Sequence, residues 1–272
     1  MQTYHQFIEE TDDSNRYGPD THSVRLAIIE WLGKKDMNLL FDIHDFNIHT
    51  LVPLPPMKEL RIGGPTLVYI PTLPNNLETL VCTDAPSLRK LPLLPNSVTT
   101  INISHTQIQE LQVPPLIKII IAESSSLTKL PYLYEGLEHL CINDTEISSL
   151  GVKSLPKSLR RLEANNTKIT YLPKLGSNLH TLSISNTNIS TLPRFPLSLR
   201  HLWLVNCKNL LLFPNSQHWL LTLEDIREYG LLWNEWHDKE EERRRIIRRL
   251  KTIKKELLLK TSSSRFFYFI TN

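Results

Sequence analysis

Residues 182–193 read LSISNTNISTLP, and this stretch decides the fold. Counted from Leu182, the apolar residues and one threonine fall at offsets 0, 2, 5, 7 and 10, which are Leu182, Ile184, Thr187, Ile189 and Leu192. Offsets 0 and 2 lie on one face of an extended strand, so both side chains can be buried while the residue between them faces outward. The pattern therefore predicts a short strand, then a turn, then an extended return.

The same frame recurs along most of the chain. Its anchors at offset 0 are Leu60, Leu80, Ile101, Ile119, Leu140, Leu162, Leu182 and Leu202. Consecutive anchors are 20, 21, 18, 21, 22, 20 and 20 residues apart, and the copies starting at Leu80, Ile119 and Leu202 need a frame one residue longer. A degenerate copy starts at Phe41. One coil cannot bury its own apolar face but stacked coils share a core, so residues 41–214 are predicted to form a solenoid of about eight or nine coils.

Two further positions repeat with the anchors. Offset 5 holds small residues, mostly hydroxylated: Thr106, Ser124, Thr145, Thr167, Thr187 and Cys207. Their hydroxyls are predicted to bond turn backbone, because turns bury amide groups that need partners. Prolines close the frame at 71, 92, 131, 173, 193 and 214, which accounts for 18 prolines against 8 glycines. Proline suits an extended back to each coil.

The repeat unit, as in PKSLRRLEANNTKITYLP at residues 156–173, resembles the short leucine-rich repeats of secreted bacterial effectors and of giant-virus repeat proteins. LWLVNCKNLLLFP at residues 202–214 also resembles the repeat of plant immune receptors. The resemblance implies an α/β solenoid, a leucine-rich repeat stack with one short parallel strand per coil on a concave face and helical caps at both ends. Some such effectors add a ubiquitin-ligase domain with a catalytic cysteine, but Cys82, Cys141 and Cys207 all lie inside repeats here.

Both ends of the stack are predicted to be covered. Residues 1–20 are expected to be mobile, 21–40 to form an N-terminal capping helix started by Thr21 or Ser23, and 215–236 to form a C-terminal cap. The first helix would bury one face made of Val24, Ala27, Ile28, Trp31 and Leu32. A basic amphipathic helix is predicted at 237–260, followed by a tail at 261–272.

The second half of this C-terminal region is strongly charged. Residues 238–260 contain ten basic and five acidic side chains, whereas the whole chain has a net charge of only +3. The basic arm consists of Arg243, Arg244, Arg245, Arg248, Arg249, Lys251, Lys254 and Lys255. Two interpretations stay open: binding of nucleic acid or an anionic surface, or a solvated helix whose apolar stripe packs on the cap or on a partner helix.

The concave surface offers the candidate partner-binding residues. In this frame the outward offsets −1 and +1 give His139, Arg161 and His201 in one column and Glu163 and Trp203 in the other. In the coil anchored at Ile119 they give Lys118 and Ile120. Aromatic and arginine side chains are the usual interface anchors. Ordinary solvated surface is the alternative for the charged residues, and burial under the C-terminal cap is the alternative for Trp203.

Known catalytic signatures are missing from the sequence. It has no glycine-rich phosphate loop and no zinc-ligand spacing, and His139 and His201 would lie about 15 Å apart across three coils. Cys82 and Cys207 are predicted to lie in the core, and Cys141 to be partly exposed and able to react. We therefore expect a non-enzymatic scaffold without cofactor or metal that binds a protein partner. The absence of a signal peptide and of a long apolar segment predicts a soluble intracellular protein, cytoplasmic or inside a host cell.

Overall fold

The computed structural model describes residues 17–34, 40–210, 234, 238–239 and 244–245. The chain divides into two compact units, Met1–Ile226 and Arg227–Asn272. In the second unit five residues are described, all helical: Asn234, Asp238, Lys239, Arg244 and Arg245. Apart from these, the predicted C-terminal cap, basic helix and tail lie outside the described residues, as do residues 1–16 of the predicted mobile segment.

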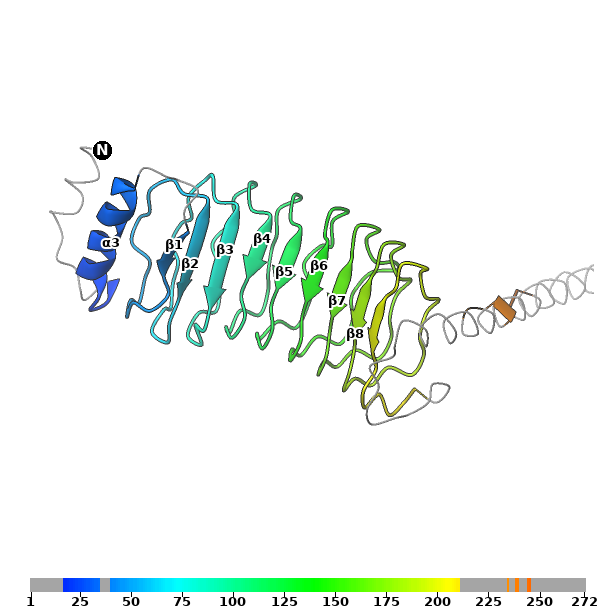
Figure 1. Cartoon of the computed structure of the whole chain (residues 1–272). Coiled ribbons are helices and arrows are strands. Elements are labelled where there is room, and N and C mark those ends of the chain that lie inside the picture. The colour runs from blue at the N-terminus through cyan, green and yellow to red at the C-terminus, as the bar shows by residue number, and fades with distance from the viewer. Residues whose placement is uncertain (1–16, 35–39, 211–233, 235–237, 240–243, 246–272) are drawn as a thin grey trace, which may run out of the picture. The chain divides into compact units, whose positions relative to one another are not determined.

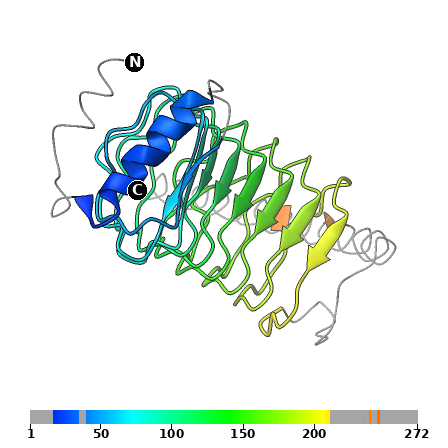
Figure 2. The same cartoon turned by 60° about the vertical axis from the view of Figure 1, so that its left-hand side comes forward.

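Nine parallel strands in sequence order form the single sheet of the first unit's described part (Figures 1 and 2). They are β1 Phe41–Ile43, β2 Glu59–Gly63, β3 Thr79–Thr83, β4 Thr100–Asn102, β5 Ile119–Ile121, β6 His139–Cys141, β7 Arg161–Glu163, β8 Thr181–Ser183 and β9 His201–Trp203. Each strand pairs with the next without a shift, so that Leu140 lies beside Leu162, which lies beside Leu182. The predicted solenoid with one strand per coil is confirmed.

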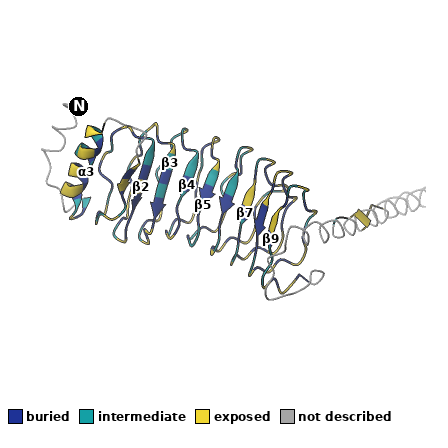
Figure 3. Cartoon of the chain, viewed as in Figure 1, coloured by how far each residue is buried: buried dark blue, intermediate teal, exposed yellow. Residues whose placement is uncertain are grey.

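The core runs through the stack behind the sheet. Buried residues recur along the strands of the sheet (Figure 3). The central residue is buried in each three-residue strand from β4 to β9, as are the second and fourth residues of β2 and β3 and both ends of β1. The residue two positions after the strand centre is also buried in most of the coils from β4 to β9. Leu60, Leu162 and Ile184, for example, have no exposed surface. Burying such a side chain stabilises the fold by about 1.5–3 kcal/mol relative to an exposed position. The repeated apolar offsets therefore hold the coils together.

The register of β5 differs from the sequence prediction. Ile120, not Ile119, pairs with Ile101 and Leu140 and has no exposed surface. The coil then fits the regular frame, with Ala122, Ser125 and Leu127 buried, and needs no extra residue. The prediction was wrong because residues 119–121 are three isoleucines, so apolarity could not distinguish inward from outward positions.

The predicted role of the offset-5 hydroxyls is confirmed. The Oγ1 atoms of Thr106, Thr145, Thr167 and Thr187 each donate a hydrogen bond of 2.7–2.8 Å to the carbonyl three residues earlier. In the β5 coil the donor is Ser125, at 2.7 Å from the Ala122 carbonyl, rather than Ser124. The preceding residue, at offset 4, has a positive φ in these coils. Each hydroxyl thus satisfies a buried carbonyl next to a sharp turn.

Helix α3, Thr21–Gly33, lies at the β1 end of the sheet (Figure 2). It buries Val24, Ile28 and Trp31, and the Trp31 ring contacts Phe41 edge-on with centroids 5.8 Å apart. The prediction that Thr21 or Ser23 caps the start of the helix was wrong, because no side chain forms a capping hydrogen bond there. The residue before the helix, Asp20, instead accepts a 2.7 Å hydrogen bond from the Asn47 amide of the first coil. The helix start is therefore tied to the solenoid.

Candidate recognition surface

The exposed side of the sheet is formed by side chains that alternate with the core residues. We call the residues at offsets −1, +1 and +3 from the buried anchor of each coil, which is Ile120 in the β5 coil, the sheet face. Parallel strands lie about 4.8 Å apart, so equivalent side chains of successive coils touch one another. Most of them are half-buried rather than fully exposed, as the patterns of β4 and β5 show. The sheet face is therefore a continuous row of partly packed side chains.

Three of the predicted site residues form one electrostatic cluster across β6 and β7. The His139 Nε2 atom lies 3.6 Å from Glu163 Oε2, and Arg161 Nη1 lies 3.5 Å from Glu163 Oε1. The neighbouring His139 side chain is the main cause that lowers the pKa of Glu163, with smaller contributions from Cys141 and Arg161, while burial opposes them. Glu163 is therefore held in its charged form between two basic side chains.

The prediction that the Cys141 thiol is partly exposed and reactive was wrong. It is 3% exposed, because it lies between the strands of its neighbours and next to Asn143, whose Nδ2 atom approaches Sγ to 3.4 Å. Burial raises the pKa of Cys141 to about 12. Since the thiolate is the reactive form, this thiol is protected rather than activated. Cys82 and Cys207 are buried in the core as predicted.

His201 and Trp203 form a second group on β9. Their rings stack with centroids 5.7 Å apart and an angle of 23° between the planes. Residues two apart on a strand share a face, which explains the contact. Thr181 and Ser183 of β8 separate this pair from the Glu163 cluster, and both are buried. The five predicted residues thus form two groups on one surface, with a floor of small side chains between them.

The apolar centre of the sheet face was not predicted from the sequence. With the corrected register, Ile119 and Ile121 are the half-buried outward residues of β5, while Lys118 lies one position earlier and Ile120 is in the core. Ile121 lies beside Cys141 in the neighbouring strand. A run of three isoleucines was the available signal, since any strand register puts at least one of them on the outward face.

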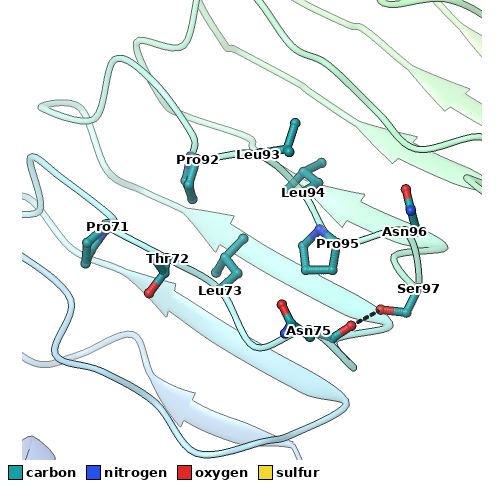
Figure 4. Close-up of a pocket in the computed structure, with 10 residues that line it drawn as sticks. All are labelled: Pro71, Thr72, Leu73, Asn75, Pro92, Leu93, Leu94, Pro95, Asn96 and Ser97. Carbon is teal, nitrogen blue, oxygen red and sulfur yellow. Dashed lines mark hydrogen bonds between the residues drawn. The ribbon is translucent and has the colours of Figure 1, made fainter.

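Shallow hollows lie on the strand connections, away from the sheet face. One of about 540 Å³ lies between two consecutive strand connections and is lined by Pro71, Leu73, Pro92, Leu93 and Pro95 among others (Figure 4). Ser97 Oγ donates a 3.0 Å hydrogen bond to the Asn75 carbonyl at its edge. Its ten lining residues include no ionisable side chain, so it offers no side chain for acid–base chemistry.

The remaining predictions concern groups outside the sheet. Of the basic arm, Arg244 and Arg245 are described as helical and exposed, and the other six residues lie outside the described ranges. Among the residues that the structure describes, no three His, Cys, Asp or Glu side chains cluster as metal ligands. No helix in that same part of the chain is long and apolar enough to cross a membrane.

A repeat of about 20 residues with one short parallel strand per turn and a shared apolar core characterises the leucine-rich repeat architecture. This chain is a leucine-rich repeat solenoid. No protein-family model matches the sequence, and no curated protein sequence matches it. Two solved structures of YopM are similar to it.

The first of these is YopM from Yersinia enterocolitica WA-314, which is 27% identical over 58% of this chain and 44% of that one, with a TM-score of 0.42. The second, a leucine-rich effector protein from Yersinia pestis, is 22% identical over 74% and 69% of the two chains, with a TM-score of 0.47. The solenoid spans less than half of the first of these proteins. Solenoids of this type are typical protein-interaction scaffolds and are generally not enzymes.

Proposed function

We propose that this solenoid is a non-enzymatic scaffold that binds a protein partner through its sheet face, the surface predicted to be concave. The observation that carries the proposal is the composition of that face between β5 and β9. It combines apolar Ile119 and Ile121, the aromatic Trp203 and the charged Arg161 and Glu163 on one rigid sheet. Interfaces use such apolar and aromatic centres with a polar surround.

The rigidity of the surface supports the same proposal. Backbone hydrogen bonds connect each coil to the next, for example from the Ala164 amide to the Ser183 carbonyl at 2.7 Å and from the Ile184 amide to the Trp203 carbonyl at 3.0 Å. Side chains fixed on a sheet lose little freedom when a partner binds, so more of the contact energy appears as affinity. Trp203 is half-buried and stacks on His201, which restricts its side chain before binding.

The test compares two triple variants with the intact protein. The sheet-face variant is His139→Ala/Arg161→Ala/Trp203→Ala, and the matched control is Gln109→Ala/Lys129→Ala/Tyr132→Ala. The control also removes one polar, one cationic and one aromatic side chain, but from exposed positions on the strand connections. Circular dichroism first establishes that both variants are folded.

Each purified protein is used to capture partners from cell lysate, and captured proteins are quantified by mass spectrometry. We expect at least one protein to be lost with the sheet-face variant and retained with the control. Hydrogen exchange of the reconstituted complex should then show protection of the segments containing β6 to β9. Equal capture by the intact protein and both variants would refute a sheet-face binding site.

A further inference from the structure

Basic side chains, three arginines and two histidines, collect where the last three strands begin. Arg160, Arg161, His180, Arg200 and His201 all lie one or two positions before the centres of β7, β8 and β9, and all five are exposed. We call these residues the cationic edge. They come from three successive coils although they span 42 positions of sequence, from 160 to 201, so only the stacking brings them together.

Backbone hydrogen bonds fix the geometry of this edge. The amides of Arg160, His180 and Arg200 each donate to the carbonyl at the equivalent position of the preceding coil, at 2.8 Å in every case. The three residues therefore follow one another at the strand spacing of about 4.8 Å, which puts the backbones of Arg160 and Arg200 about 10 Å apart. Their side chains form a regular row.

The arginines of the cationic edge are only partly neutralised by acidic side chains. Arg160 Nε lies 4.0 Å from Glu138 Oε2, and Arg161 is paired with Glu163 as described above. In the described part of the chain, no salt bridge involves Arg200. At the other end of the sheet, by contrast, Lys58 at the equivalent position pairs with Glu78 at 2.9 Å.

We propose that the cationic edge docks an acidic segment of the protein partner, with carboxylates bound by Arg160 and Arg200. This inference rests on the proposed function. The planar guanidinium group matches a carboxylate with two parallel hydrogen bonds, which makes arginine suited to this role. Three or four acidic residues in extended form, at about 3.3 Å per residue, span the row.

The surroundings favour a protein segment over a nucleic acid. Glu138 lies 4.0 Å from Arg160 and Glu163 lies 3.5 Å from Arg161. Both carboxylates would repel a continuous phosphate backbone bound along these arginines, whereas a peptide can place neutral residues opposite them. Trp203 stacks on His201 of the edge and provides an apolar contact for the residues that flank the acidic segment. The edge is also short, covering three coils rather than a long track.

The experiment measures binding of three probes by fluorescence anisotropy at low salt. They are a peptide with four consecutive glutamates, the same peptide with glutamines in their place, and an oligothymidylate of ten nucleotides, all with the same dye. The proteins are the intact chain, Arg160→Ala/Arg200→Ala, and the control Arg89→Ala/Lys90→Ala. The control removes the same charge from exposed positions on a strand connection.

We expect the glutamate peptide to bind more tightly than the glutamine peptide, and about tenfold more weakly to the Arg160→Ala/Arg200→Ala variant than to the control, since two charge-assisted contacts are lost. Equal binding of both peptides, or equal effects of both variants, overturns the inference. Preferential binding of the oligonucleotide at this edge also overturns it. If the lysate partner is lost with the sheet-face variant yet retained by Arg160→Ala/Arg200→Ala, the scaffold function stands and this inference fails.

Discussion

Two neighbouring isoleucines of β5 allow a direct test of the strand register. Ile120 has no exposed surface and lies between Ile101 and Leu140, whereas Ile119 is half-buried on the sheet face. Ile119→Ala and Ile120→Ala remove the same atoms from adjacent positions. Only the direction in which the side chain points differs between them, so each variant is the matched control of the other.

The structure sets the expected size of the two effects. Truncating a fully buried isoleucine loses its transfer free energy and leaves a cavity, which lowers the free energy of unfolding by about 2–5 kcal/mol. Ile119 is already partly in contact with water and leaves no closed cavity, so its truncation should cost less than about 1 kcal/mol. The register with Ile119 in the core predicts the reverse order.

Urea unfolding followed by circular dichroism at 25 °C measures the difference. Both variants should retain the spectrum of the intact protein in the absence of urea. The unfolding midpoint of Ile120→Ala should then fall well below that of Ile119→Ala. Equal midpoints, or a lower midpoint for Ile119→Ala, would refute the register and with it the presence of Ile119 and Ile121 on the sheet face.

Three further outcomes follow from the same structure. A Cβ atom at Gly63 would lie 2.0 Å from the Thr83 carbonyl oxygen, so Gly63→Ala should lower the unfolding free energy by about 3 kcal/mol, while Gly33→Ala, with open space around it, should not. The pKa of Glu163 is lowered in the folded state. The ionised Glu163 side chain therefore stabilises the fold above its unfolded-state pKa of about 4.3, and this stabilisation is lost as the pH falls through its folded-state pKa. Melting temperatures of the intact protein and Glu163→Gln should therefore differ at pH 7 and converge at strongly acidic pH, and a constant difference would contradict this. Cys141, with its pKa near 12, should resist iodoacetamide at pH 8 until urea unfolds the chain; rapid alkylation of the native thiol would show that it is accessible.

The sheet face shows where sequence reasoning succeeded and where it did not. Counting offsets from the anchors placed His139, Arg161, Glu163, His201 and Trp203 on the strands of the sheet, where the structure has them. The contacts between them were not predictable, because the distance from His139 to Glu163 depends on how neighbouring coils align. The burial of Cys141 was not predicted for the same reason. Side chains of the adjacent strands, not neighbours in sequence, keep water away from its thiol.

The sequence by itself determined the solenoid, because a strand must alternate its faces and the recurring leucine and isoleucine offsets can be buried only by stacking identical coils. It also determined the hydroxyl contacts at Thr145 and Thr167, which are local to one turn. Only the tertiary structure decided the direction of Ile119 and Ile120, since three consecutive isoleucines fit either register until Ile101 and Leu140 fix one of them. The cationic edge likewise exists only after stacking, which brings basic side chains from three successive coils together along one edge of the sheet.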